Sequence, residues 1–163
     1  MGKGNGLKAL EQFNRFYLHN QLKREKEIKD YTLDIDATAI SGQKKEAEMT
    51  YKGFKGYMPI VGHLAENGLV IYAEFRQGNV APAARNLEFI KQCERQMPKG
   101  KRIGYIRADA ASYQAEIFNY CEERRIVLLP KSIADFGLFG LLTGYYFYLI
   151  PHITFIVPCK ENS

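Results

Sequence analysis

The sequence predicts an α/β fold in which helices cover one mixed sheet, and three observations support this prediction. An amphipathic stretch is followed by three consecutive extended segments, after which helical and extended segments alternate. Acidic residues also occur inside one predicted strand and at the tip of another. Three consecutive strands favour antiparallel neighbours, whereas strands separated by helices favour parallel ones. We therefore expect an antiparallel half joined to a parallel half.

Composition and charge restrict the class of protein. With 163 residues, 46% hydrophobic and 25% charged, the chain is typical of a single globular domain. The net charge of +5 favours an anionic partner. Cys93, Cys121 and Cys159 are too far apart for a zinc motif or a disulfide framework. Because residues 1–6 also lack the apolar core of a signal peptide, we expect a cytoplasmic protein.

The first predicted element is a helix over residues 7–31. Apolar side chains recur in it at close to the helical period, and mixed charges follow near its end. The members of this apolar stripe are Leu10, Phe13, Phe16, Tyr17 and Leu22. The pattern indicates a surface helix packed by one face, with a role in facing DNA as the alternative.

The first predicted strand, residues 32–40, is apolar and β-branched but contains two carboxylates. Successive side chains of a strand alternate between its faces, so Asp34, Asp36 and Thr38 share one face. Carboxylates in the middle of a core strand are unfavourable without a cationic partner. A charged partner or a metal ion is therefore expected beside them.

A second extended segment, residues 49–64, follows a polar turn over residues 41–48 that contains Lys44 and Lys45. Lys52 and Lys55 alternate with aromatic residues there, which suits phosphate contact and base stacking on DNA. An edge strand with solvated lysines remains the alternative. Glycines in the segment suggest a bulge or a close backbone approach. His63 has no metal-ligand spacing and is expected to be structural.

The remaining elements follow from turn and cap signals. The turn at 66–68 predicts a hairpin into a strand over 69–75. A helix is expected from Pro82 to Met97, then a strand over 102–109 that ends in an acid. Ser112 is predicted to cap a further helix that ends near Arg124, and residues 126–129 form a last short strand.

The placement of the acids suggests a metal site. If the first and fourth strands are central neighbours, Asp36 and Asp109 converge at one edge of the sheet. That arrangement is ribonuclease-H-like. Carboxylates on adjacent strands suit a pair of Mg²⁺ or Mn²⁺ ions that activate a nucleophile and stabilise a leaving oxygen at phosphorus. The alternative is that both acids simply face solvent.

Four segments resemble bacterial insertion-sequence transposases of the DDE type, and more narrowly the transposase DDE domain, group 1. They are residues 33–38, 51–59, 75–79 and 107–113, in that order. The resemblance covers about residues 7–125. It implies a ribonuclease-H-like catalytic domain with a two-metal Mg²⁺ (or Mn²⁺) site. It also implies binding to terminal repeats and target DNA, strand cleavage, strand transfer and a homo-oligomer.

The resemblance also assigns catalytic and metal-binding residues. Asp36 matches the first acid of the family, which occurs in an Asp-x-Thr pattern, with Asp34 the weaker candidate. Asp109 matches the second acid, which ends an Arg-x-Asp strand. The third acid, a Glu on a later helix, is unknown here. Glu122 and Glu123 come too early, and Glu161 lacks a surrounding motif.

The C-terminal part departs from the family pattern near Arg124. Residues 136–159 contain no Asp, Glu, Lys or Arg. We expect an N-terminal helical segment (1–31), a partial DDE domain incomplete at its C-terminus (32–130) and an aberrant hydrophobic tail (131–163). A truncated or frameshifted copy, inactive without the third acid, explains this best. The alternatives are a non-catalytic DNA-binding fragment and a protein tethered to a membrane through 136–159.

Overall fold

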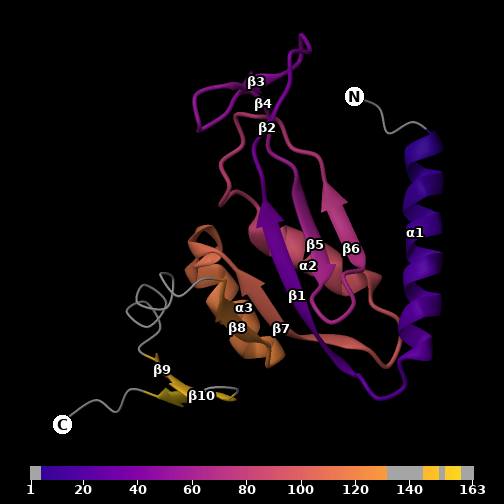
Figure 1. Cartoon of the computed structure of the whole chain (residues 1–163), viewed down its shortest axis with the longest axis vertical. Coiled ribbons are helices and arrows are strands. Elements are labelled where there is room, and N and C mark those ends of the chain that lie inside the picture. The colour runs from indigo at the N-terminus through magenta and orange to yellow at the C-terminus, as the bar shows by residue number, and fades with distance from the viewer. Residues whose placement is uncertain (1–4, 132–144, 151–152, 159–163) are drawn as a thin grey trace.

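A computed structural model describes residues 5–131, 145–150 and 153–158, and its centre is a five-stranded mixed sheet (Figure 1). The strand order of this main sheet is β6-β5-β1-β7-β8. β5 is antiparallel to β1 and β6 to β5, whereas β7 is parallel to β1 and β8 to β7. The bounds are β1 Asp30–Ala37, β5 Ile60–Leu64, β6 Val70–Glu74, β7 Arg102–Ala108 and β8 Val127–Pro130.

This order and these directions are those of a ribonuclease-H-like fold, as the sequence predicts. The first and fourth predicted strands, now β1 and β7, are the central neighbours. Their carboxyl ends lie at the same edge of the sheet because the two strands are parallel. The predicted adjacency of these two strands is confirmed.

The core lies between the main sheet and helix α2 (Asn86–Gln96), which runs behind the sheet in Figure 1. Leu33 and Ile35 of β1 are buried, as are Phe89 and Ile90 of α2. A Cβ at Gly62 of β5 would lie 2.9 Å from the Cys93 sulfur. The helix therefore approaches the β5 backbone directly, and glycine permits that approach.

Helix α1 (Asn5–Arg24) ends seven residues earlier than predicted and stands along the β6 edge of the sheet (Figure 1). Leu18 and Leu22 near its C-terminus are buried in the common core. The other predicted apolar positions are exposed: Leu10 by 63%, Phe13 by 64%, Phe16 by 67% and Tyr17 by 45%. The expected packing of the predicted stripe is wrong, because the side of α1 that meets the sheet instead carries Leu18, Leu22 and Asn14, whose amide donates to the Val70 carbonyl of β6 at 3.2 Å.

The predicted strand over 49–64 is also wrong as a single element. Its first part belongs to a small three-stranded sheet of β2 (Ile40–Ser41), β4 (Lys55–Tyr57) and β3 (Glu48–Met49), and its last part is β5. A tight turn at Thr50–Phe54 separates β3 from β4. A Cβ at Gly56 would overlap the Ile40 carbonyl oxygen, so the predicted close backbone approach is confirmed there.

The second half of the domain follows the predicted alternation with one correction. A short 3₁₀ helix, η1 (Ala110–Ser112), comes after β7, and helix α3 (Ala115–Arg124) begins only after it. Ser112 does not cap α3; its hydroxyl is buried and accepts a hydrogen bond from the Asn86 amide at 3.1 Å. The cap prediction is wrong because Ser112 is the last residue of η1 and Gln114 occupies the N-cap position of α3.

Two strands of the predicted tail, β9 (Tyr145–Ile150) and β10 (Ile153–Pro158), pair antiparallel. They occupy part of the interval suggested as a membrane span. Within the described residues, no helix has both the length and the apolar character needed to cross a membrane. Residues 132–144, 151–152 and 159–163, with Glu161, lie outside the described part, so the predicted domain boundary at 131 stays a prediction.

Candidate active site

Asp34, near the middle of β1, has both of its oxygens engaged by Arg107, with His63 close by. The Asp34 side chain is only 5% exposed. Arg107 of β7 donates from Nε to Asp34 Oδ1 at 2.6 Å and from Nη2 to Oδ2, which makes the pair bidentate. His63 Nε2 of β5 lies 3.4 Å from Asp34 Oδ2. This fork-to-fork pairing raises the pKa of Arg107 and fixes both side chains.

Asp36, two residues further along β1, lies at the open edge of the same face. Its side chain is 51% exposed. The Thr38 hydroxyl donates to Asp36 Oδ2 at 2.5 Å, and Lys131 Nζ donates to Oδ1 at 2.7 Å. These hydrogen bonds, with Lys131 the larger cause, hold the pKa of Asp36 below its usual value. Asp36 is therefore an accessible, ionised carboxylate.

Asp109 follows the last residue of β7 and starts the turn into η1. Its Oδ1 accepts a hydrogen bond from the Ala111 N–H at 3.2 Å, so the carboxylate caps this short helix. The Ser112 N–H donates to the Asp109 carbonyl at 3.0 Å. One side-chain oxygen and the local backbone thus orient Asp109 at the edge of the sheet.

The register of the strands aligns three charged residues. Asp34 pairs with Arg107 in the β1–β7 ladder, and Ala108 pairs with Pro130 in the β7–β8 ladder. The paired part of the β1–β7 ladder ends at Asp34 and Arg107; continued by two residues, the same register would set Asp36 level with Asp109, and the β7–β8 register would set Asp109 level with Lys131. The Lys131 N–H continues the β7–β8 ladder, donating to the Ala108 carbonyl at 3.0 Å. We call Asp36, Asp109 and Lys131 the acid–lysine row.

The loop that holds Asp109 is braced from beneath by a buried polar network. Arg76, at the end of β6, is 2% exposed and donates to the Ala84 carbonyl at 2.8 Å and to Asn86 Oδ1 at 3.3 Å. Asn86 in turn donates to Ser112. Burial lowers the pKa of Arg76. The network ties β6 and α2 to η1, so the position of Asp109 depends on residues distant in sequence.

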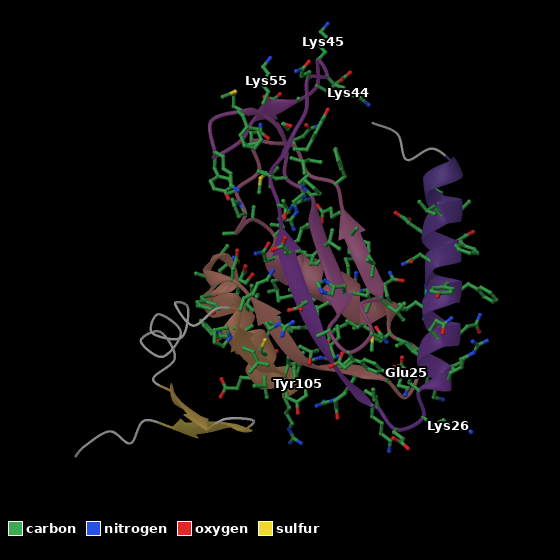
Figure 2. The ribbon with its side chains drawn as sticks, viewed as in Figure 1. Glu25, Lys26, Lys44, Lys45, Lys55 and Tyr105 are labelled. Atoms are coloured by element: carbon green, nitrogen blue, oxygen red, sulfur yellow. The ribbon has the colours of Figure 1, made fainter. Side chains whose placement is uncertain are left out.

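The predicted DNA-binding lysines lie on the small sheet. Lys44 and Lys45 lie in the turn between β2 and β3, Lys52 in the next turn, and Lys55 begins β4; all four are exposed. In Figure 2, Lys44, Lys45 and Lys55 lie at the outer end of the small sheet, beyond the carboxyl end of β1. Ser41, Gly42, Gln43 and Lys55 line a shallow hollow there.

The aromatic residues that alternate with Lys52 and Lys55 in the sequence differ in their exposure. Tyr51 is 63% exposed, with the Lys52 ammonium 5.7 Å from its ring centroid. Tyr57 is buried instead and packs against Phe75, with ring centroids 4.7 Å apart. The ring of Tyr51 is therefore available to a nucleobase, whereas Tyr57 serves the packing of the small sheet.

The family model described as transposase DDE domain group 1 matches residues 3–129, which is most of the chain. The chain belongs to this family. The resemblance stated from the four sequence segments is thereby confirmed, and residues 3–129 form a transposase DDE domain.

Solved structures of catalytic domains are also similar to this DDE domain. The HTLV-2 integrase catalytic core domain in complex with magnesium is 17% identical, with a TM-score of 0.45, and 68% of this chain and 66% of that chain are covered. The Mos1 transposase catalytic domain with Raltegravir and Mn is 15% identical, with a TM-score of 0.47 and 85% and 67% covered. The Mos1 mariner paired-end complex with Mn is 14% identical, with a TM-score of 0.45 and 85% and 46% covered.

The DDE domain covers 66% and 61% of the two HTLV-2 integrase chains and 40% of a chain in the simian T-cell lymphotropic virus intasome. No sequence among the curated proteins matches it.

The sequence predicts a cationic partner beside the carboxylates of β1, but it does not show that Arg107 and Lys131 are the partners. Lys131 is the first residue after β8, so the parallel strand ends that place Asp109 at the site also place Lys131 there. Arg107 alternates with Asp109 along one strand, and that spacing was a usable signal. Among the described residues, no group of three or more His, Cys, Asp or Glu side chains is placed to hold a metal ion. The third acid stays unassigned.

Proposed function

We propose that this chain acts in DNA transposition through a site formed by Asp36 and Asp109, with the small sheet as its DNA contact. The observation that supports this most is the acid–lysine row, in which one exposed carboxylate lies near the carboxyl end of β1 and another directly follows the adjacent parallel strand β7. Asp34 is the weaker ligand because both of its oxygens are bonded to Arg107.

The residues present fit a divalent metal. Asp36 already attracts a cation, since the Lys131 ammonium lies 2.7 Å from Oδ1. Carboxylate oxygens are the ligands that Mg²⁺ and Mn²⁺ prefer. Asp36 and Asp109 would hold the metal, which supplies nucleophile activation and leaving-oxygen stabilisation in phosphodiester cleavage and strand transfer.

The neighbouring residues of the chain orient these ligands. Thr38 fixes one oxygen of Asp36, and the Ala111 N–H fixes one oxygen of Asp109. Arg107 removes Asp34 from competition, and its side chain, 44% exposed, remains near the site as a fixed positive charge. A DNA phosphate approaching the edge of the sheet is attracted by that charge.

The small sheet would bind the DNA backbone outside the site. Lys44, Lys45, Lys52 and Lys55 are exposed there, and each contact with a phosphate releases counterions. Tyr51 offers a stacking surface to an unpaired base. DNA held by these lysines would reach the carboxyl end of β1, on which side Figure 2 places Lys44, Lys45 and Lys55.

Fluorescence anisotropy with a labelled duplex over a range of salt concentrations tests the DNA contact. The affinity of the full chain should fall steeply with salt, and Lys45→Met and Lys55→Met should each reduce the magnitude of the salt slope by about 1. Lys26→Met is the matched control, because Lys26 lies at the opposite end of the molecule (Figure 2). A slope that changes equally in all three variants would reject the small sheet as the DNA contact.

Thermal unfolding tests the metal site in the same chain. Mg²⁺ or Mn²⁺ should raise the melting temperature, because a ligand that binds only the native state stabilises it. Asp36→Asn and Asp109→Asn should abolish that rise. Because no third acid is assigned, we also propose that the chain binds DNA and metal without cleaving the DNA, and a cleavage assay on a duplex with Mn²⁺ tests this.

A further inference from the structure

Lys131 is a charged residue that the proposed chemistry does not use, although it contacts the candidate metal ligand. Its ammonium donates to Asp36 Oδ1 at 2.7 Å, and its side chain is 35% exposed. Its backbone is anchored to the Ala108 carbonyl. The residue is thus held by the sheet on one side of Asp109 and reaches the carboxylate on the other side.

The strand order shows which residue lies between Lys131 and Asp36. β7 lies between β1 and β8, so the row runs Asp36, Asp109, Lys131. Lys131 follows β8 and its ammonium reaches Asp36 of β1, so the side chain spans the width of the intervening β7, which ends just before Asp109. A divalent cation shared by Asp36 and Asp109 would meet the ammonium there, and two cations a few ångströms apart repel each other.

An ammonium displaced from Asp36 needs another anion. In the proposed function, the nearest such anion is a phosphate of the DNA at the same edge of the sheet. Lysine is a suitable ligand for it, because its compact charge on a flexible stem can move between two oxygen acceptors without a change in the backbone.

We propose that Lys131 couples metal binding to DNA binding by exchanging Asp36 for a DNA phosphate. This inference rests on the proposed function of the Asp36–Asp109 site. DNA that takes the ammonium frees Asp36 for the metal, and a metal that binds Asp36 frees the ammonium for DNA. Coupling of this kind is reciprocal, so each ligand raises the affinity for the other by the same factor.

The expected size of the effect follows from the exposure of the pair. Both side chains are partly solvated, 35% for Lys131 and 51% for Asp36, so their interaction is screened. Breaking an exposed ion pair changes an equilibrium by about two- to fivefold. We expect DNA to tighten Mn²⁺ binding by about that factor in the parent chain.

Mn²⁺ titrations of the full chain, with and without a short duplex, test the exchange. Lys131→Met should bind Mn²⁺ about two- to fivefold more tightly than the parent without DNA, bind DNA more weakly, and show no tightening by DNA. Lys131→Gln provides a second neutral variant. Lys45→Met is the matched control, since it should weaken DNA binding but keep both the parent Mn²⁺ affinity and the coupling.

The outcomes separate this inference from the proposed function. If the parent binds Mn²⁺ and both neutral variants bind it with unchanged affinity and coupling, Lys131 has no such role while the site stands. If the parent and both variants fail to bind Mn²⁺, the metal site itself is wrong and the exchange is rejected with it. If Mn²⁺ binds only after Lys131 is neutralised, the competition is supported in its strongest form.

Discussion

The main sheet and the small sheet are stabilised by different interactions. The main sheet buries a continuous cluster that includes Leu33, Ile35 and Ile106 beneath α2 and its neighbours. The small sheet has short strands whose side chains are largely exposed, and glycine allows its backbone segments to approach closely. From this comparison we infer that the two sheets have different roles: the packed main sheet positions the acids, and the small sheet presents lysines to DNA.

The largest difference between the two sheets should appear in stability. Ile106→Ala removes a fully buried side chain and should lower the free energy of unfolding by about 2–5 kcal/mol. Met49→Ala in the small sheet, where Met49 is 53% exposed, should change it by less than about 0.5 kcal/mol. Urea denaturation measures both values. Equal losses would show that the small sheet contributes to the cooperative core.

The next effect distinguishes the two acids of β1. Asp34→Asn removes the charge that Arg107 and His63 face, and should lower the free energy of unfolding by about 1–3 kcal/mol. Asp36→Asn should change it by less than about 1 kcal/mol, because solvent screens this half-exposed carboxylate. Urea denaturation of the two single variants decides the order, and the reverse order would contradict the assigned roles.

For these two acids, the sequence predicts the face that they share but not the partner that distinguishes them. Alternation along β1 correctly placed Asp34 and Asp36 on one face, because the period of a strand is a local property. The partner that separates their roles, Arg107, lies 73 residues away from Asp34, and only the register of β1 against β7 brings it there. The family motif favoured Asp36, and the burial of Asp34 supplies a physical reason for that choice.

The strand order of the main sheet could be predicted from the sequence, but which apolar residues of α1 are buried could not. Apolar runs, turn signals and the rules for parallel connections lead to β1 and β7 as neighbours. Helical periodicity in α1 identifies an apolar face, but it does not say how far the sheet extends beneath it. Leu18 and Leu22 meet the core, whereas Leu10 and Phe13 do not.

A smaller effect is expected from a backbone change in the small sheet that leaves the main sheet intact. In Gly56→Ala, the added methyl group would overlap the Ile40 carbonyl oxygen, so β2 and β4 must move apart. DNA affinity should fall while the cooperative unfolding of the main sheet is retained. Gly6→Ala is a matched control, since nothing lies near a Cβ at Gly6. Anisotropy and circular dichroism together measure the outcome, and unchanged DNA affinity would contradict it.

The smallest effect concerns pH. Lys131 and Thr38 lower the folded-state pKa of Asp36, so its ionised form stabilises the native state. That contribution is fully present above the usual pKa of about 4 and is lost as the pH falls through the lower folded-state value. Lys131→Met should therefore flatten the decline in melting temperature below about pH 4. Identical acid profiles for the parent and this variant would argue against the ion pair.

The central claim is that Asp36 and Asp109 are ligands of the same metal site. A double-mutant cycle on Mn²⁺ binding tests this claim most directly. Electron paramagnetic resonance of free Mn²⁺ gives the affinity of the parent, Asp36→Asn, Asp109→Asn and the double variant. If the two acids share a site, each single change should abolish binding nearly as completely as both changes together. Losses of Mn²⁺ affinity that add up in the double variant would contradict the shared site. Mn²⁺ binding that is retained in each of the two single variants would also contradict it.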